Sequence, residues 1–434
     1  MPPKFWASLK SKGKSSSSSS TPAPDIPLHA QFPTKAPVET KIRCTMLATA
    51  MLDALAAPME SHKRFTFPFL DSMLPNENFK EETLPPGVWT DDTSLSLCLA
   101  NSMSTMKETR DATFIGGFDE VHQLRVYRRW YRECYLCCAG KQWHNKTDIR
   151  SALQMFTQFE SDPEQALHRI RENLGGDKND TNGSLIRIAP VGLAYWHDEV
   201  DVKYYAKRNS QATHPSTICM DACEAWAACM SLVMQEVTPT EPRRDRFGSE
   251  LPRLTKLTLV EFLSRYPFTS NSLRAHLTVP FGAPPIPQDI AERERYFFQY
   301  HPLLRLMEET QSAAAKAGRP EASFPYNIPT AEQLPSTNYV VDTIVCAFYC
   351  FLTTKTFEEG ALMAVNLGHN SCSVAVVYAA LAALWYSAEE GPKPDVTFWS
   401  KRVKEWRDAV LKRDLIEEVI GNLIIWEDKI ARLT

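Results

Sequence analysis

The chain has 434 residues, of which 44% are hydrophobic and 23% charged, as in a soluble globular protein of one large domain or two smaller ones. Its formal net charge of −4 gives no electrostatic reason to bind nucleic acid or an anionic membrane, so neither partner is predicted. The N-terminus lacks an apolar signal core, and the longest apolar runs, 340–352 and 374–386, are too short to span a bilayer. We therefore expect a monomeric intracellular protein, cytoplasmic or nuclear.

The N-terminal residues 1–41 differ in composition from the rest of the chain. They contain the serine run Ser15–Ser20, scattered prolines and several lysines. Such a segment cannot bury enough apolar area to offset its conformational entropy. We predict a disordered tail over 1–41, dispensable for stability, and a folded domain over 42–434.

The first ordered segment, 45–60, has the Ala, Leu and Met content of a buried helix that ends near Pro58. Asp53 lies inside this apolar run and needs a partner, because an unpaired buried carboxylate is costly. Glu60 follows seven residues later, two helical turns further along if the helix continued.

The segment 87–103 contains a cluster of hard oxygen donors directly before an apolar, helix-like run. Thr90, Asp91, Asp92 and Thr93 offer two carboxylates and two hydroxyls, the ligand type that Mg²⁺ or Ca²⁺ selects. Negative charge is also favoured at a helix N-terminus. The alternative is that these residues only cap a helix, since Thr and Asp are common N-cap residues.

Three cysteines, Cys134, Cys137 and Cys138, resemble half of a zinc site, but no second Cys-x-x-Cys follows. Most of the others lie inside apolar helix-like runs and are expected to be small core residues. The pattern favours reduced thiols in an intracellular protein.

The polar loop 175–184 runs directly into an apolar segment, 185–196, that predicts another buried helix. Backbone N–H groups at such a helix start could hold a pyrophosphate, although an ordinary Gly/Asn turn explains the composition equally well. Arg187 could pair with a phosphate or form a buried ion pair. His214, considered alone, is typical of a structural histidine.

Residues 238–337 are richer in proline and mixed charge and predict short helices within a long insertion. Apolar segments at 339–352, 356–367 and 374–387 and an amphipathic C-terminal region complete the domain. Strand-like alternation is nearly absent, so the predicted fold class is all-α.

Four stretches in sequence order resemble the ADP-ribosylglycohydrolase family. They are LDALAAPME (52–60), GVWTDDTSLSLCLANSM (87–103), NGSLIRIAPVGLAY (182–195) followed by ATHPS (212–216), and TNYVVDTIVCAFYCFLTTKTFEEGALMAVNLG (337–368). The resemblance implies a compact orthogonal multi-helix bundle with a magnesium site, usually of two ions. It also implies hydrolysis of the glycosidic bond at C1″ of an ADP-ribosyl group.

The resemblance assigns roles to residues in each stretch. Glu60 matches an acidic position that acts on water or substrate in some members, and Asp92 is the second residue expected at the reaction centre. The remaining matches are Thr90, Asp91, Asp92 and Asp53 around the metal, Asn182, Gly183 and Ser184 at the ribose and diphosphate, and His214 near the ligand. We expect Asp91 and Asp92 to lie close to Asp53 and to the loop 370–373.

The chain departs from the family pattern in that last loop, which normally reads Gly-Gly-Asp-x-Asp-Thr. Here residues 368–373 read Gly-His-Asn-Ser-Cys-Ser, so Asn370 and Ser373 remain as neutral oxygen ligands and Cys372 offers a soft one. A unit charge lost about 4 Å from a divalent ion forfeits on the order of 8 kcal/mol at an effective dielectric of about 20. We therefore expect one Mg²⁺ rather than two.

The functional prediction is a protein that binds ADP-ribose or an ADP-ribosylated protein, with hydrolysis weak or lost. One alternative is an active Mg²⁺-dependent ADP-ribosyl hydrolase with an atypical metal site. The other is a non-catalytic α-helical interaction protein. The sequence leaves open whether the linkage is to arginine, serine or a free ester.

Overall fold

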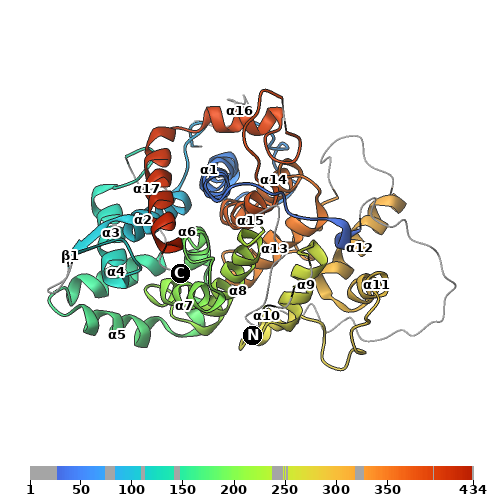
Figure 1. The fold of residues 1–434 in the computed structure, drawn as a ribbon, viewed down its shortest axis with the longest axis horizontal. Coiled ribbons are helices and arrows are strands. Elements are labelled where there is room, and N and C mark those ends of the chain that lie inside the picture. The colour runs from blue at the N-terminus through green and yellow to red at the C-terminus, as the bar shows by residue number, and fades with distance from the viewer. Residues whose placement is uncertain are drawn as a thin grey trace.

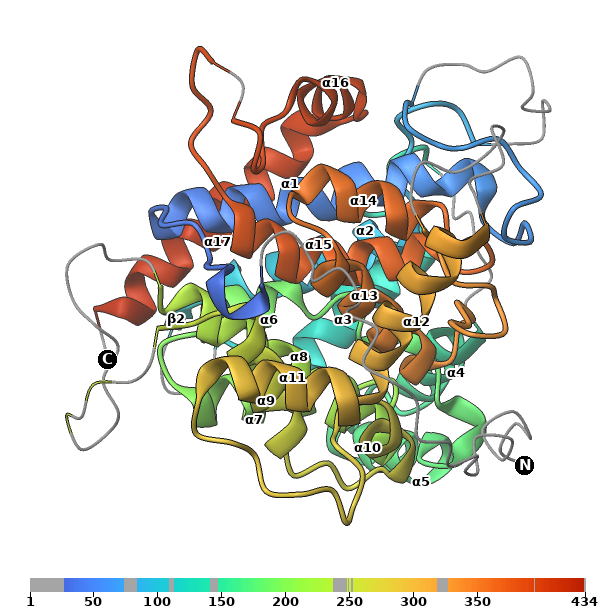
Figure 2. The same cartoon turned by 90° about the vertical axis from the view of Figure 1, so that its right-hand side faces the viewer.

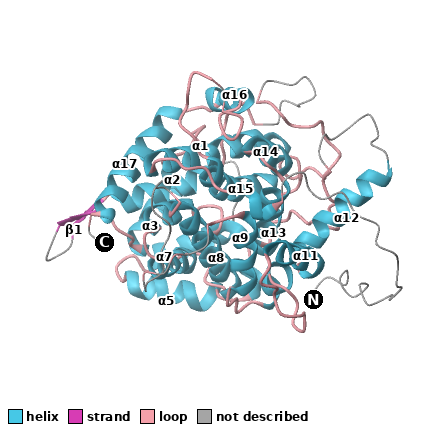
Figure 3. Ribbon diagram, turned by 45° about the vertical axis from the view of Figure 1, so that its right-hand side comes forward, coloured by secondary structure: helices cyan, strands magenta, loops and turns pink. Residues whose placement is uncertain are grey.

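The computed structural model describes residues 27–73, 84–108, 113–140, 147–236, 248, 250, 253–317, 327–393 and 395–432. Over these residues the regular secondary structure is almost entirely helical, which confirms the all-α prediction (Figure 3). The described part contains one short hairpin, in which β1 (Met106–Glu108) pairs antiparallel with β2 (Thr113–Ile115). The helices are α1 (Val38–Ala56), α2 (Asp91–Ser104), α3 (Glu120–Glu133), α4 (Thr147–Gln158), α5 (Pro163–Leu174), α6 (Ala189–Ala194), α7 (Glu199–Gln211), α8 (Thr217–Met234), α9 (Lys256–Arg265), α10 (Asn271–Leu277), α11 (Ile290–Tyr300), α12 (Pro302–Ala317), α13 (Val340–Thr353), α14 (Phe357–Val365), α15 (Ser371–Tyr386), α16 (Lys401–Ala409) and α17 (Arg413–Ala431).

Two apolar helices, α1 and α15, form the centre of the fold and pack along each other (Figures 1 and 2). Every residue of α15 is buried, and so is α1 from Cys44 onward. A helix with neighbours on all sides needs no polar face, which explains the lack of amphipathic spacing in both sequences. In Figure 1, α2 to α5 lie on one side of this pair and α9 to α12 on the other.

Two stretches, Val38–Met59 and Thr217–Met234, are long and apolar enough to cross a membrane by length and composition alone. Within them, 89% and 78% of the residues of the most apolar window are buried inside the protein. Burial in the hydrophobic core therefore explains why both stretches are apolar.

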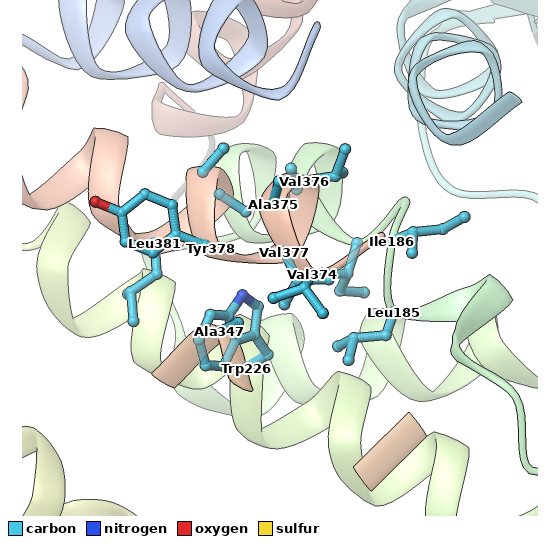
Figure 4. Close-up of a cluster of buried hydrophobic side chains, with 14 of the residues drawn as sticks. Leu185, Ile186, Trp226, Ala347, Val374, Ala375, Val376, Val377, Tyr378 and Leu381 are labelled. Atoms are coloured by element: carbon cyan, nitrogen blue, oxygen red, sulfur yellow. The ribbon is translucent and has the colours of Figure 1, made fainter. Parts of the chain in front are cut away.

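The start of α15 and the segment after the predicted ligand loop share one apolar cluster (Figure 4). Val374 and Val377 of α15 lie beside Leu185 and Ile186, with Trp226 of α8 beneath them. The cluster positions the loop that precedes α15 relative to the loop that precedes Leu185. Two segments far apart in the sequence are thereby held next to each other.

The predicted insertion contains the short helices α9 to α12, as expected. Leu257, Phe297 and Leu304 from these helices are buried and belong to the main hydrophobic core. The insertion is thus part of the same packed domain. The predicted lower limit at 238 lies outside the described residues.

The predicted boundary between tail and domain is wrong for residues 27–41, which are packed against the core. The Leu28 N–H donates to Glu294 Oε1 of α11 (2.8 Å), and the Thr34 N–H donates to Trp385 O at the end of α15 (2.8 Å). Pro and Lys in this segment suggested disorder, but Leu28 and the backbone find partners that are distant in sequence. Residues 1–26 lie outside the described residues, so their disorder stays a prediction.

We predict that a chain beginning at residue 37 is less stable than one beginning at residue 27. The longer truncation exposes the Leu28 pocket, and full burial of such a side chain contributes about 1.5–3 kcal/mol. It also removes the hydrogen bonds of Leu28 and Thr34. Thermal unfolding of both chains should show a melting temperature several degrees lower for the shorter one, and equal values would contradict this role.

A second stability prediction concerns Lys41 of α1, whose ammonium group is buried. Lys41 Nζ donates to Leu384 O (2.8 Å) and Thr34 O (3.2 Å), and burial lowers its pKa from 10.5 to about 8. Between these values the unfolded chain binds more protons than the folded one, so the free energy of unfolding rises with pH in this window. Relative to a Lys41→Met variant, the wild type should gain roughly 2–3 kcal/mol between about pH 7.5 and about pH 10.5.

Denaturant unfolding at both pH values measures this difference. A methionine at the exposed Lys401 is the matched control and should show no such pH-dependent difference from the wild type. A difference between wild type and Lys41→Met that does not change with pH would mean that Lys41 keeps its ordinary pKa.

Candidate functional site

Asp53, near the end of α1, is fully buried and holds the start of α2 through four hydrogen bonds. Thr90 donates its N–H to Oδ2 (2.8 Å) and its hydroxyl to Oδ1 (2.8 Å). Thr93 donates its N–H (3.1 Å) and its hydroxyl (2.6 Å) to Oδ2. The partner that a buried Asp53 required is therefore the Thr90–Thr93 turn. Burial, and next the nearby Asp92 carboxylate, raise the pKa of Asp53 to about 7.

The Thr90–Thr93 turn forms the N-terminus of α2, so the capping interpretation of this sequence is correct. Thr90 is the N-cap, and its hydroxyl oxygen accepts the Asp92 N–H (3.2 Å). Asp91 and Asp92 are buried in the first turn, where the helix dipole favours their negative charge. Since the Thr90 proton is directed to Asp53, its oxygen presents only lone pairs to its other neighbours.

The first turn of α15 reaches this turn directly. Ser373 Oγ donates to Asp92 Oδ2 at 2.7 Å, and both side chains are buried. Together with the Asp53 contacts, this bond shows that α1, the start of α2 and residues 370–373 meet, which agrees with the position predicted for Asp92. Three segments separated by as many as 320 positions thus build one polar cluster inside an apolar core.

Glu60 joins the cluster through Asn370 in a directional chain of amide hydrogen bonds. Asn370 Nδ2 donates to Glu60 Oε1 (3.1 Å), and Asn182 Nδ2 donates to Asn370 Oδ1 (2.7 Å). Asn182 Nδ2 also lies 2.9 Å from the Thr343 hydroxyl of α13. The chain links a predicted catalytic residue, a predicted metal ligand and a predicted ligand-binding residue.

Backbone pairing brings Glu60 and Asn370 together. The Ser61 N–H donates to His369 O (2.7 Å), and the His369 N–H donates to His62 O (2.6 Å). Gly368 has φ = 69°, and a Cβ there would lie 2.7 Å from His62 O, so this position requires glycine. The two loops are therefore locked side by side.

The Asn182–Ser184 loop is a buried 3₁₀ turn, which differs from the exposed loop that the sequence predicted. The Asn182 N–H donates to Asn338 O (2.9 Å), so this group is committed to the fold and cannot serve a pyrophosphate. The predicted helix 185–196 is shorter and begins only at Ala189, because residues 185–188 form turns. Because α6 has six residues and begins only at Ala189, beyond the Asn182–Ser184 turn, its dipole contributes little to binding a phosphate at that turn.

His214 lies against this loop and is 1% exposed. A Cβ added to Gly183 would lie 2.6 Å from His214 Nε2, so the histidine ring packs directly on the glycine. Arg187 is also fully buried, and among the described residues it pairs with no carboxylate, while its contact with a phosphate stays a prediction. Its donors go to neutral oxygens of Gly183, Asn209 and Thr213.

The donor set allows a test of whether a divalent cation fits this cluster. In the described part of the chain, no three His, Cys, Asp or Glu side chains are grouped so that they could hold a metal. The Asp92 carboxylate lies beside the Ser373 hydroxyl, and Asp91 precedes it in the same turn, which Thr90 caps. These are hard oxygen donors of the type that Mg²⁺ prefers, and their number suits one ion better than two. The hydrogen bonds of Asp53 give it a structural role instead, and its role as a ligand stays a prediction.

Within the described residues, Cys134, Cys137 and Cys138 belong to no group of His, Cys, Asp or Glu side chains that could hold a metal ion. All eleven cysteines lie in the described part, and none forms a disulfide. Lys412 Nζ donates to Cys137 O (2.9 Å), so this turn serves to fix α17 beside the start of α2.

Comparisons with known proteins agree on one family. The sequence model of the ADP-ribosylglycohydrolases matches residues 34–430. The ADP-ribosylarginine hydrolase Tri1 of Pseudomonas putida is 22% identical over 341 residues, which cover 76% of this chain and 68% of that protein. An uncharacterised protein of Archaeoglobus fulgidus is 23% identical over 402 residues, covering 92% and 100% of the two chains.

Two further comparisons extend this similarity. The ADP-ribosylhydrolase ARH3 of Gallus gallus is 26% identical over 202 residues, which cover 44% of this chain and 49% of that protein. Among solved structures, an ADP-ribosylglycohydrolase-related protein complex superposes with a TM-score of 0.54 and 24% identity, covering 90% of this chain and 99% of the other. The structural match shows a shared fold.

Proposed function

The chain belongs to the ADP-ribosylglycohydrolase family, and from this premise we propose that it binds an ADP-ribosyl group at the cluster of Asp92, Asn370 and Asn182, with hydrolysis weak or lost. The observation that supports this proposal most is the direct link from Asn182 through Asn370 to Glu60. It places a ligand-type loop next to a carboxylate that could act on the C1″ bond.

The loop 368–373 supports the second half of the proposal, that hydrolysis is weak or lost. Its side chains at the cluster are an amide and a hydroxyl, and both already make hydrogen bonds within the protein. Neutral groups do not supply the charge that would hold a second divalent cation. Asn370 instead donates its amide proton to Glu60, a contact that needs no cation.

One Mg²⁺ is proposed at Thr90, Asp91 and Asp92, with the Ser373 hydroxyl beside it. When bound, such an ion would supply a fixed positive charge for ligand oxygens. The protein contributes the arrangement of these donors: Asp53 orients the Thr90 hydroxyl, and Ser373 orients the Asp92 carboxylate.

An active hydrolase is the second candidate, and the position of Glu60 favours it. Asn370 fixes Oε1 of this carboxylate, which could then accept a proton from a water molecule at the cluster. Because the similar protein Tri1 of Pseudomonas putida is named an ADP-ribosylarginine hydrolase, arginine-linked ADP-ribose is the first substrate to test. A non-catalytic interaction protein is the remaining alternative.

Calorimetric titration with ADP-ribose, with and without Mg²⁺, tests the proposal, followed by a turnover assay on ADP-ribosylated arginine. Binding strengthened by Mg²⁺ with little turnover is the expected result. Robust turnover would favour the active hydrolase, and absence of binding would favour the interaction protein. An Asp92→Ala variant should lose the Mg²⁺ effect, whereas alanine at the exposed Asp408 of α16 should not.

A further inference from the structure

Arg187 is a buried cation that has no acidic partner within the described part of the chain. It is 0% exposed, and its guanidinium donates to Asn209 Oδ1 (3.1 Å), Asn209 O (3.0 Å), Gly183 O (2.9 Å) and Thr213 Oγ1 (2.6 Å). All of these acceptors are neutral, and Arg187 forms no ion pair with any described carboxylate. The centroid of the Tyr127 ring lies 4.9 Å from the guanidinium carbon, within the range of a cation–π contact.

Such an arrangement is costly, because a buried charge is normally paired with an opposite one. The hydrogen bonds and the aromatic ring offset only part of the desolvation. The guanidinium is bonded to the carbonyl of Gly183, in the middle of the proposed ligand loop. An anionic ligand at this loop would supply the missing countercharge.

Arg187 also determines which nitrogen of His214 carries the proton. The Thr213 hydroxyl has two neighbours in hydrogen-bond distance, Arg187 Nη2 and His214 Nδ1 (2.7 Å). A guanidinium can only donate, so the buried Thr213 proton has Nδ1 as its acceptor. His214 is thereby held with its proton on Nε2, the atom that faces Gly183.

We propose that Arg187 is a positioning residue that makes the Asn182–Ser184 loop selective for an anionic ligand, the diphosphate of an ADP-ribosyl group. Arg187 fixes the Gly183 carbonyl through a hydrogen bond, and through Thr213 it directs the His214 Nε2–H toward the loop. Arg187 also places a positive charge, which no described carboxylate compensates, beneath the loop. The identity of the ligand rests on the proposed function, whereas the proton position on His214 does not. Arg187 is too deeply buried to touch the ligand and acts through these neighbours.

Binding to two probes by the full chain tests the charge: ADP-ribose, and adenosine as a neutral probe that lacks the diphosphate. Arg187→Met should weaken ADP-ribose binding roughly tenfold or more, about 1.4 kcal/mol, and leave adenosine binding within a factor of about two. Arg187→Lys keeps the charge but not the planar fork and should lose less. An Arg187→Met protein that is folded by circular dichroism and binds ADP-ribose as the wild type does would overturn the proposal.

The ring nitrogens of His214 provide a readout that needs no ligand. In ¹⁵N-histidine-labelled protein, with His214 identified by the signal that a His214→Gln variant lacks, the wild type should carry the proton on Nε2. Thr213→Val should abolish this fixed state and Thr213→Ser should restore it, while both keep the Arg187 charge. A proton on Nδ1 in the wild type would overturn the positioning role.

The two measurements keep the proposals apart. If the wild type binds no ADP-ribose but shows Nε2–H with the expected response of the Thr213 variants, the proposed function fails and the positioning role stands. If Arg187→Met does not fold, Arg187→Lys and Thr213→Val decide: unchanged ADP-ribose binding in Arg187→Lys together with an unchanged His214 in Thr213→Val would refute the inference.

Discussion

Asp53→Ala is expected to lower the free energy of unfolding by about 3–5 kcal/mol, within the range for breaking a buried charged network. The change leaves four donors from Thr90 and Thr93 without an acceptor in the core. Each unsatisfied buried group costs about 1–3 kcal/mol, and the cavity left by the carboxylate adds to this. Because these donors define the start of α2, the same variant should also lose Mg²⁺ and ADP-ribose binding.

Denaturant unfolding of the wild type and four variants measures this effect. Thr93→Val removes one hydrogen bond to Asp53 and should cost about 1.5–3 kcal/mol, whereas Thr93→Ser keeps the hydroxyl and should cost less. Asp53→Asn should also destabilise, because its amide nitrogen would face a donor. A loss below about 1 kcal/mol in Asp53→Ala would show that the turn rearranges and does not depend on this carboxylate.

Part of this site could be predicted from the sequence because the physical argument was local. An aspartate inside an apolar helix demands partners, and a Thr-Asp-Asp-Thr segment before an apolar run supplies donors at a helix start. The structure joins these two features directly, through the bonds from Thr90 and Thr93 to Asp53. The resemblance to a family placed both features at one site, and the contact of Ser373 with Asp92 agrees with it.

Other features of the structure could not be predicted, because no pattern in the neighbouring sequence indicates them. The bond between Glu60 and Asn370 depends on backbone pairing of residues 61–62 with His369, across more than 300 positions. The role of Arg187 depends on Asn209 and Thr213, which look like ordinary polar residues on and after a surface helix. Residues 27–41 have the composition of a tail, but the burial of Leu28 and the hydrogen bonds of Leu28 and Thr34 to distant residues make them part of the domain.

Restoring negative charge at residues 370 and 372, at the start of α15, gives the second large expected effect. In the double variant Asn370→Asp, Cys372→Asp, a carboxylate at 370 would replace the amide that lies 3.1 Å from Glu60 Oε1. Two carboxylates in such proximity repel each other unless a proton or a cation lies between them. A carboxylate at 372 would lie next to Ser373, which already contacts Asp92, and position 372 is fully buried.

We therefore expect the double variant to bind Mg²⁺ at least roughly tenfold more tightly than the wild type in a calorimetric titration. Without Mg²⁺ it should be less stable than the wild type by several kcal/mol, since two buried charges lack partners, and Mg²⁺ should recover most of this loss. Some hydrolysis of ADP-ribosyl arginine should also appear. Asn370→Ala, Cys372→Ala is the matched control and should show neither the Mg²⁺-dependent recovery of stability nor the activity.

The possible outcomes distinguish a defect in the metal ligands from a defect elsewhere in the site. Tighter Mg²⁺ binding without turnover would mean that the cation position is restored but Glu60, now facing a carboxylate instead of an amide, is no longer held in place. Unchanged Mg²⁺ affinity would mean that the hydrogen bonds from Asn182 to residue 370 and from Ser373 to Asp92 hold the loop in a form that cannot turn toward an ion. Robust turnover by the unmodified chain would show that the amide chain from Asn182 to Glu60 positions the catalytic carboxylate well enough without a second cation.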